Sequence, residues 1–198
     1  STSSTDFPGT SGSFQSTKAD LQDGVIVKLN SSLSQILWSS YIGGLGNDAV
    51  FGVAIAQDNS LYITGGTSSS DFPVRTGAFQ SNNAGGSCDA FLSHISADGK
   101  TLIHSTFFGT SSYDQMFLIQ LDRDDHPHVF GQTEHSGGQY IFNAAFNNTG
   151  GGQVLAHFRP DLGSRVWSTQ FGSSPGVPNI SPTAFLVDKC NSLYLAGW

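Results

Sequence analysis

Aspartates are the residues of this sequence best suited to chemistry, because they recur at a fixed spacing. Asp23 and Asp89 lie 66 residues apart, and so do Asp48 and Asp114. Clustered carboxylate oxygens can hold Ca²⁺, which takes about six to eight oxygen ligands. The alternative is that each side chain accepts hydrogen bonds from backbone N–H groups in a tight turn. We favour the turn interpretation for all four residues.

The run Asp122-Arg123-Asp124-Asp125 is similar to a calcium-binding loop when it is taken in isolation. It aligns, however, with Ala56-Gln57-Asp58-Asn59, which we interpret as a plain hairpin turn between two strands. The run also lacks the glycine and the distant glutamate of an EF-hand loop. The sequence therefore predicts a turn here and not a calcium site.

Two of the six histidines form the best candidate for a transition-metal pair. His126 and His128 flank Pro127 at the expected start of a strand, so both side chains could face the same side. Imidazole nitrogens are common ligands of transition metals. No third ligand is visible at a useful spacing, so we predict no metal site and expect these histidines to be solvated or packed between sheets.

Other chemical signatures are weak. His94 and His157 occupy the position that Lys28 has in the repeat described below, and a position that accepts lysine does not require a metal ligand. Cys88 and Cys190 lie in different parts of different repeats, so we expect them to be unpaired although an extracellular setting would permit a disulfide. There is no Gly-x-Ser-x-Gly elbow and no phosphate-binding loop. We therefore predict no catalytic residue, no cofactor and no enzymatic activity.

Composition points to an all-β protein. Turn residues are abundant, and β-branched and aromatic runs lie between them.

Charge and hydrophobicity exclude two classes of partner. The chain has 198 residues, of which 12% are charged and 37% hydrophobic, and its net charge is −7. An acidic chain has no electrostatic attraction to phosphate backbones, so nucleic acid is excluded as an expected partner. No apolar run approaches the roughly 20 residues needed to cross a bilayer, so membrane insertion is not expected.

The elements that must position these residues come in three copies of one unit. The copies are 23–67, 89–133 and 152–198, with inter-blade loops at 1–22 and 68–88. The loops repeat as well, since Asp6-Phe7-Pro8 returns as Asp71-Phe72-Pro73. Each copy holds four apolar runs of strand length, which in the first copy are Val25–Leu29, Ile36–Ile42, Phe51–Ala56 and Leu61–Thr64.

Four-stranded units repeated in sequence are typical of β-propellers. Runs such as Val25-Ile26-Val27 are apolar on both faces, so we expect sheets that are covered on both sides. We predict three four-stranded antiparallel blades that form part of a larger propeller, with the Phe72 and Phe79 loops packed against the blade edges. A β-solenoid is the alternative. Propellers have about four to eight blades, so three would leave open faces and unpaired edges for a longer chain or for further copies to fill.

The repeat resembles the bacterial SBBP β-propeller repeat. The residues that carry the resemblance include Ser39-Ser40-Tyr41-Ile42-Gly43-Gly44, Leu61-Tyr62-Ile63-Thr64-Gly65 and Gly77-Ala78-Phe79-Gln80. Segments such as Val129-Phe130-Gly131-Gln132-Thr133 are similar to large surface proteins of gliding bacteria. The resemblance implies secretion, typically by a type IX system, and a scaffold without catalytic residues.

The expected function is therefore that of a non-catalytic module, secreted or at the cell surface, for adhesion, presentation or interaction with a protein or glycan. Its partners would be other domains of the same longer protein, other copies of the chain, or a surface glycan or protein. One alternative is a structural subunit of an extracellular assembly or filament, joined through open blade faces or edges. Another is a polysaccharide-active propeller enzyme that uses Asp48 and Asp114.

Overall fold

The protein is built from β-strands. The computed structural model describes residues 1–173 and 175–198, and within them it contains twelve strands and no helix. The predicted all-β class is thus confirmed, and no helix in the described ranges is long and apolar enough to cross a membrane. In chain order the strands are β1 (Gly24–Leu29), β2 (Ile36–Ile42), β3 (Asp48–Ile55), β4 (Leu61–Thr67), β5 (Asp89–Ile95), β6 (Leu102–Phe108), β7 (Asp114–Leu121), β8 (Pro127–Thr133), β9 (Gln153–Phe158), β10 (Arg165–Phe171), β11 (Pro182–Val187) and β12 (Leu193–Gly197).

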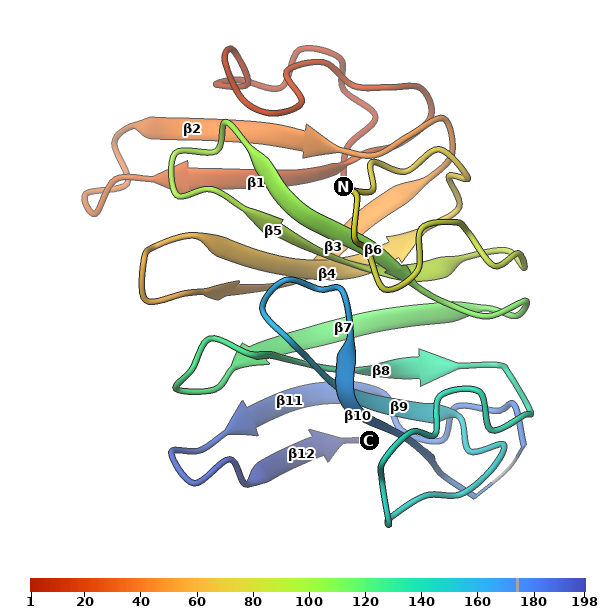
Figure 1. Ribbon diagram of the computed structural model, residues 1–198. Helices are drawn as coiled ribbons and strands as arrows, with labels where there is room; N and C mark the ends of the chain where they lie inside the picture. Colours follow the sequence, from red (N-terminus) through yellow and green to blue (C-terminus); the bar gives the residue numbers. More distant parts are fainter. Residues whose placement is uncertain (174) are drawn as a thin grey trace.

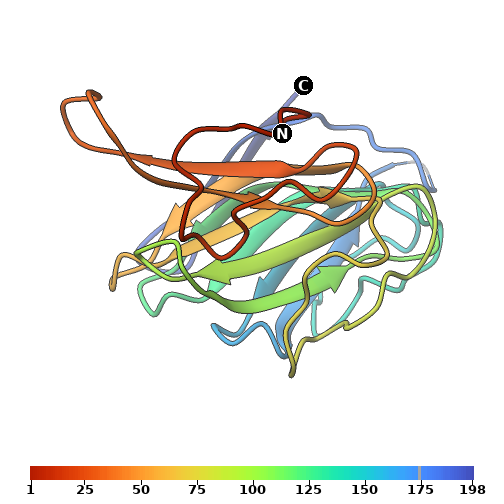
Figure 2. The same cartoon turned by 90° about the horizontal axis from the view of Figure 1, so that it is seen from above.

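These strands form a stack of four antiparallel sheets. Two sheets are complete, with the strand orders β3-β4-β5-β6 and β7-β8-β9-β10, and two are half-sheets, β1-β2 and β11-β12. Figure 1 shows the half-sheets at opposite ends of the stack. Seen from above, the strands of successive sheets change direction steadily (Figure 2). The predicted four-stranded antiparallel sheets are therefore present, and the described residues form an open stack and not a closed ring.

The sheets do not coincide with the predicted blades 23–67, 89–133 and 152–198. Strands β3 and β4 of the first copy pair with β5 and β6 of the second, so each predicted blade is divided between two sheets. A repeat can be divided at any point of its period, and the prediction divided it at the long loop 68–88. That loop instead lies within a sheet, between the paired strands β4 and β5, whereas the short segment 43–47 leads from one sheet to the next.

The long loops follow the free edges of the outer strands. On β6, the N–H of Phe107 donates a hydrogen bond to the carbonyl of Gln80 (3.1 Å). Segment 1–22 bonds the edge of β2 in the same way, and segment 134–152 bonds the edge of β10. The equivalent bonds join Tyr41 N–H to the carbonyl of Gln15 (3.1 Å), and Phe142 to Ser168 in both directions (2.9 Å each).

The hydrophobic core lies between the sheets and under these loops. Strand β7 is central, because it packs on β3 and β4 of one neighbouring sheet and on β11 of the other. Phe72 packs on Phe91 with ring centroids 4.3 Å apart, and Phe79 meets Phe158 edge-on at 5.6 Å. The loop 68–88 follows the edge of β6, as predicted, and its rings Phe72 and Phe79 reach beyond that edge to β5 and β9.

A β-bulge recurs in the inner hairpin of each complete sheet, by which we mean β3–β4 or β7–β8. Strand β3 bulges at Phe51 opposite Gly65, and β7 bulges at Phe117 opposite Gly131. The two bulged phenylalanines contact each other across the sheets, with ring centroids 5.3 Å apart. A bulge turns a side chain away from the regular alternation, and here it brings the two rings together.

Candidate functional site

Asp48 and Asp114 hold loops in place. Asp48 Oδ2 accepts hydrogen bonds from the N–H of Gly44 (2.9 Å) and the hydroxyl of Ser69 (2.8 Å). Asp114 Oδ2 accepts bonds from both the N–H (2.6 Å) and the hydroxyl (2.7 Å) of Thr110. The other oxygen of each carboxylate accepts a threonine hydroxyl. The predicted turn interpretation is confirmed for both residues.

Asp23 and Asp89 also hold loops in place, at the ends of the long loops 1–22 and 68–88. Asp23 Oδ2 accepts a bond from the N–H of Ala19 (3.0 Å), and Asp89 Oδ2 accepts one from the N–H of Ala84 (2.6 Å). Both side chains are buried. Burial, with the nearby charge of Asp114 adding to it, raises the pKa of Asp89 to about 7. The predicted turn interpretation holds for these residues too, and burial gives Asp89 an unusual titration.

This titration makes the stability of the fold depend on pH. The pKa of Asp89 is about 7 in the folded chain and 3.8 ordinarily, so the unfolded chain loses this proton first as the pH rises. The stabilising contribution of protonated Asp89 is therefore complete below about pH 4 and is lost as the pH rises through 7. Urea unfolding at pH 5 and pH 8 should show a decline to which Asp89 contributes about 1–2 kcal/mol.

The variant Asp89→Asn keeps the hydrogen-bond acceptor for Ala84 and should remove most of that decline. Asp98→Asn is the matched control, because Asp98 is exposed and its pKa is lowered by hydrogen bonds from Ser96 and Lys100. An equal decline in the parent chain and in Asp89→Asn would show that Asp89 does not titrate in this range.

The run Asp122–Asp125 is a hairpin turn, as predicted. Asp122 Oδ1 accepts hydrogen bonds from the N–H groups of Asp124 and His126, both at 2.9 Å. The turn between β11 and β12 is built in the same way, since Asp188 Oδ1 accepts bonds from the N–H groups of Cys190 (2.8 Å) and Ser192 (2.9 Å). The carboxylate closes the turn in both places.

The structure brings two further side chains to His128, Asp122 and His157, which the sequence spacing did not reveal. His128 lies opposite His157 in the β8–β9 register, and their rings stack with centroids 4.0 Å apart. Asp122 Oδ2 is 3.5 Å from His128 Nε2 and 3.8 Å from His157 Nε2, and His126 Nδ1 is 3.1 Å from His157 Nε2. We refer to Asp122, His126, His128 and His157 as the histidine cluster. Of the two environments expected for these histidines, solvated or packed, His128 has the packed one, since 2% of its side chain is exposed.

Sequence reasoning missed this cluster because it divided the repeat at the long loop and not at the short segment between sheets. Strands β8 and β9 were assigned to different blades, so His128 and His157 were not expected to be neighbours. In the first complete sheet, the corresponding His94 has other contacts: its Nε2 is 2.7 Å from the hydroxyl of Ser60, and its ring stacks on Tyr62. Burial lowers the pKa of His94 to about 4, and the neighbouring His104 adds to the shift.

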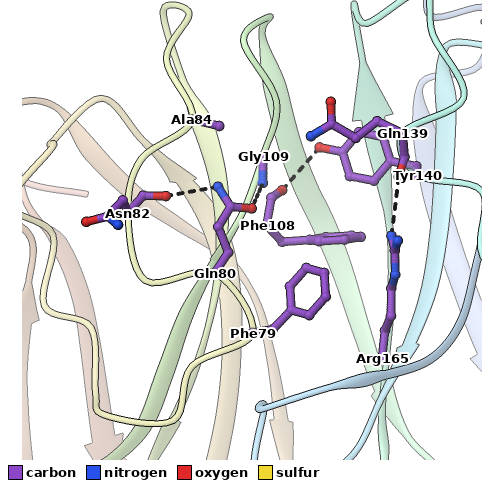
Figure 3. A pocket seen from close by; sticks show the side chains of 9 residues that line it. All are labelled: Phe79, Gln80, Asn82, Ala84, Phe108, Gly109, Gln139, Tyr140 and Arg165. Carbon is purple, nitrogen blue, oxygen red and sulfur yellow. Dashed lines mark hydrogen bonds between the residues drawn. The ribbon is translucent and has the colours of Figure 1, made fainter.

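A cavity of about 360 Å³ opens between the two complete sheets at the end of β6 (Figure 3). Phe79 and Phe108 form its apolar wall, and the guanidinium of Arg165 lies over the Phe79 ring at 5.2 Å. The Gln80 side chain is bonded to another residue of the cavity wall, because its Oε1 accepts a hydrogen bond from the N–H of Gly109 (3.1 Å). The size is that of a ligand pocket, but its polar groups are engaged in holding the loops, so we assign it no ligand.

One end of the stack leaves an apolar surface uncovered. A groove of about 470 Å³ lies between the free edge of β1 and the adjacent face of β3. Val53 and Ile55 on that face are 58% and 67% exposed, whereas Ile119, the residue equivalent to Val53 on β7, is 4% exposed because β3 covers it. We refer to this surface as the open groove, which is lined by Val25, Val27, Leu29, Val53, Ile55, Leu61 and Ile63.

The other end exposes the half-sheet β11–β12, which we refer to as the open hairpin. Tyr194 on β12 is 55% exposed, whereas its equivalents Tyr62 and His128 are each 2% exposed within complete sheets. Leu186 and Leu195 of the same hairpin are also exposed. Both ends therefore expose positions that the complete sheets bury.

The cysteines are free, as predicted, with Cys88 buried and Cys190 exposed. Burial raises the pKa of the Cys88 thiol to about 11, so it is not a reactive thiolate at neutral pH.

No protein-family model matches the chain, and a search of curated proteins finds no match to it. Its function is therefore inferred from its own residues and geometry.

Proposed function

We propose that the protein is a non-catalytic β-propeller module whose open groove binds the open hairpin of a second copy of the chain. The observation that carries the proposal is the contrast in exposure between equivalent positions. Val53 and Tyr194 are largely exposed at the two ends, whereas Ile119 and Tyr62 are buried within complete sheets. The ends expose apolar surface of the kind that marks an interaction site.

The two ends are complementary. Each complete sheet joins an inner hairpin, β3–β4 or β7–β8, to an outer hairpin, β5–β6 or β9–β10. Within the described residues, the open hairpin β11–β12 is equivalent to an inner hairpin and pairs with no outer hairpin, whereas β1–β2 is equivalent to an outer hairpin and pairs with no inner hairpin. Each chain thus carries the half-sheet that completes the other, and an unpaired strand edge supplies the backbone groups for joining them.

The register of the joined sheet follows from the complete ones. Tyr62 lies opposite His94 in the β4–β5 ladder. In the repeat, Tyr62 corresponds to Tyr194 and His94 corresponds to Lys28. Pairing of β12 with β1 thus places Tyr194 opposite Lys28, where the aromatic ring and the ammonium group attract each other.

Reciprocal joining of two copies produces a closed assembly. Each copy contributes two complete sheets and two half-sheets, so two copies form six four-stranded sheets. This number falls within the range of about four to eight blades found in propellers. A two-fold axis, the commonest symmetry of homo-oligomers, relates the two joints.

Such a module presents loops and binding surfaces at its rim, and we place it outside the cell, as the resemblance to SBBP repeats implies. Adhesion or presentation of a protein- or glycan-binding surface is its expected role. The alternative of a polysaccharide-active enzyme needs carboxylates that are free to react. The oxygens of Asp48 and Asp114 accept several hydrogen bonds from the loops around them, which favours the non-catalytic role.

Cysteine cross-linking tests the joint and its register. In a Cys190→Ser background, the double variant Lys28→Cys/Tyr194→Cys should form an intermolecular disulfide under mild oxidation. The matched control is Lys28→Cys/Leu195→Cys, because a shift of one residue turns the second side chain to the other face of the sheet. Light scattering of the parent chain should give the mass of two copies.

A monomer at high micromolar concentration, or equal cross-linking in the two double variants, would contradict the proposal. The variant Val53→Asp places a charge in the open groove and should convert the dimer to a monomer while leaving the fold intact, because Val53 is exposed within one chain.

A further inference from the structure

We propose that the histidine cluster is a binding site for a divalent transition-metal ion, with zinc the best fit. The ligand atoms of Asp122, His128 and His157 all lie within 4.8 Å of one another. Ligands held about 2.0–2.1 Å from a tetrahedral zinc ion are roughly 3.3 Å apart. The separations in the cluster are 3.1 Å between His126 Nδ1 and His157 Nε2, 3.5 Å between Asp122 Oδ2 and His128 Nε2, and 3.8 Å between Asp122 Oδ2 and His157 Nε2.

The two oxygens of Asp122 have separate partners. Oδ1 accepts the backbone hydrogen bonds that close the hairpin turn. Oδ2 is directed at the rings of His128 and His157. The turn therefore accounts for one oxygen and fixes the carboxylate in place, while the other oxygen remains available as a ligand.

Three ring nitrogens of the cluster lack a hydrogen-bond partner. His128 is 2% exposed, yet neither of its ring nitrogens has a hydrogen bond, and Nδ1 of His157 has none either. Buried polar groups of folded proteins are nearly always paired, so unpaired ones call for a missing partner. A metal ion bound between Asp122 Oδ2 and the two Nε2 atoms supplies that partner for His128.

Equivalent positions elsewhere in the chain supply an internal comparison. In the first complete sheet the corresponding residues are Ala56, Ser60, Tyr62 and His94. The Nε2 atom of His94 lies 2.7 Å from the Ser60 hydroxyl, whereas its Nδ1 has no hydrogen bond. In the open hairpin, Asp188 is followed by Ser192 and Tyr194, and its Oδ2 accepts the Tyr194 hydroxyl at 3.1 Å. Among the described residues, Asp122, His128 and His157 of the histidine cluster are the one group of three or more acids, histidines or cysteines with ligand spacing.

The position of the cluster suggests a structural role. Its ligands come from the β7–β8 turn, from β8 and from β9, and the last two strands are connected by the long segment 134–152. A metal ion here links the inner hairpin of the sheet to its outer hairpin. The rings of His128 and His157 are stacked with centroids 4.0 Å apart and lie 15° from parallel, so binding requires both rings to tilt substantially before their in-plane lone pairs converge on one ion. His126 is half-buried, so the cluster is not fully enclosed.

Titration of the metal-free chain with Co²⁺ and then Zn²⁺ tests the proposal. We expect one Co²⁺ per chain, intense visible absorption bands of a tetrahedral site, and displacement by one Zn²⁺. Saturating Zn²⁺ should raise Tm by roughly 5 °C or more, because the ion binds the folded state.

Two variants and one control locate the site. Asp122→Asn keeps the Oδ1 acceptor of the turn and should weaken Zn²⁺ binding at least about tenfold. His128→Tyr introduces the residue found at both equivalent positions, Tyr62 and Tyr194, and should abolish binding while preserving the β-sheet circular dichroism spectrum. Asp188→Asn changes the equivalent turn and should leave binding unchanged.

Three results would overturn the proposal: no saturable binding of Co²⁺ or Zn²⁺ by the parent chain at micromolar concentrations, a weak octahedral Co²⁺ spectrum, or binding by folded His128→Tyr equal to that of the parent chain.

Discussion

Replacement of Phe108 by alanine is expected to lower the free energy of unfolding by about 4 kcal/mol. Phe108 is 2% exposed at the end of β6. Its ring meets Tyr140 edge-on at 4.8 Å, Phe158 at 5.0 Å and Phe79 at 6.1 Å. These rings belong to strands of both complete sheets and to the long loop within each sheet, so the alanine leaves a cavity where four segments meet.

Urea unfolding of the variant and the parent chain measures this loss, which corresponds to a fall in Tm of roughly 10 °C for a chain of this length. Phe146→Ala is the matched control, because Phe146 is a surface residue of segment 134–152. We expect it to cost less than about 1 kcal/mol. A similar cost for the two variants would mean that the Phe108 rings do not hold the sheets together.

Replacement of Gly65 by alanine is expected to cost about 3 kcal/mol. A Cβ atom at this position would lie 1.8 Å from the carbonyl oxygen of Ala49, which belongs to the backbone of the paired strand and cannot move alone. The bulge at Phe51 causes this close approach, because it brings the β3 backbone against Gly65. The same argument applies to Gly131, where the carbonyl oxygen of Gln115 would be 2.1 Å away.

Gly138→Ala serves as the control for a methyl group added to a loop. Its Cβ would lie 3.4 Å from the nearest atom, the flexible end of Ile141, so we expect a change within about 0.5 kcal/mol. Thermal unfolding of the two alanine variants checks the difference. If Gly65→Ala were as stable as Gly138→Ala, the bulge would have to relax without loss of pairing.

Much of the fold could be predicted from the sequence because it depends on local signals. The repeat of Leu61–Gly65 at Leu193–Gly197, and the turns after Asp58 and Asp122, correspond to strands and hairpins in the structure. The grouping of strands into sheets could not be predicted, because the apolar runs repeat equally well whether a sheet begins at the first or at the third strand of a copy. The pairing of β4 with β5 depends on contacts made across a long loop, for which the sequence contains no comparable local signal.

The candidate site also combines a part that local sequence signals predict, the turn aspartates, with a part that depends on long-range strand pairing, the histidine cluster. The aspartates Asp48, Asp89 and Asp114 bond groups close to them in the chain or in the neighbouring hairpin strand, so their turn role followed from residue type and spacing. The contact of His128 with His157 depends on the β8–β9 ladder, and it becomes predictable once the grouping of strands into sheets is known.

The loops that border β2, β6 and β10 also determine the direction in which copies of this protein can add to one another. Backbone groups such as those of Tyr41, Phe107 and Ser168 are already bonded, so the flanks of the stack have few sites for a foreign strand. For copies that join as we propose, growth is thereby restricted to a single dimension, along the line of stacked sheets. Rings or unbranched fibres are the forms compatible with that restriction, whereas lateral aggregation into amyloid-like layers is suppressed.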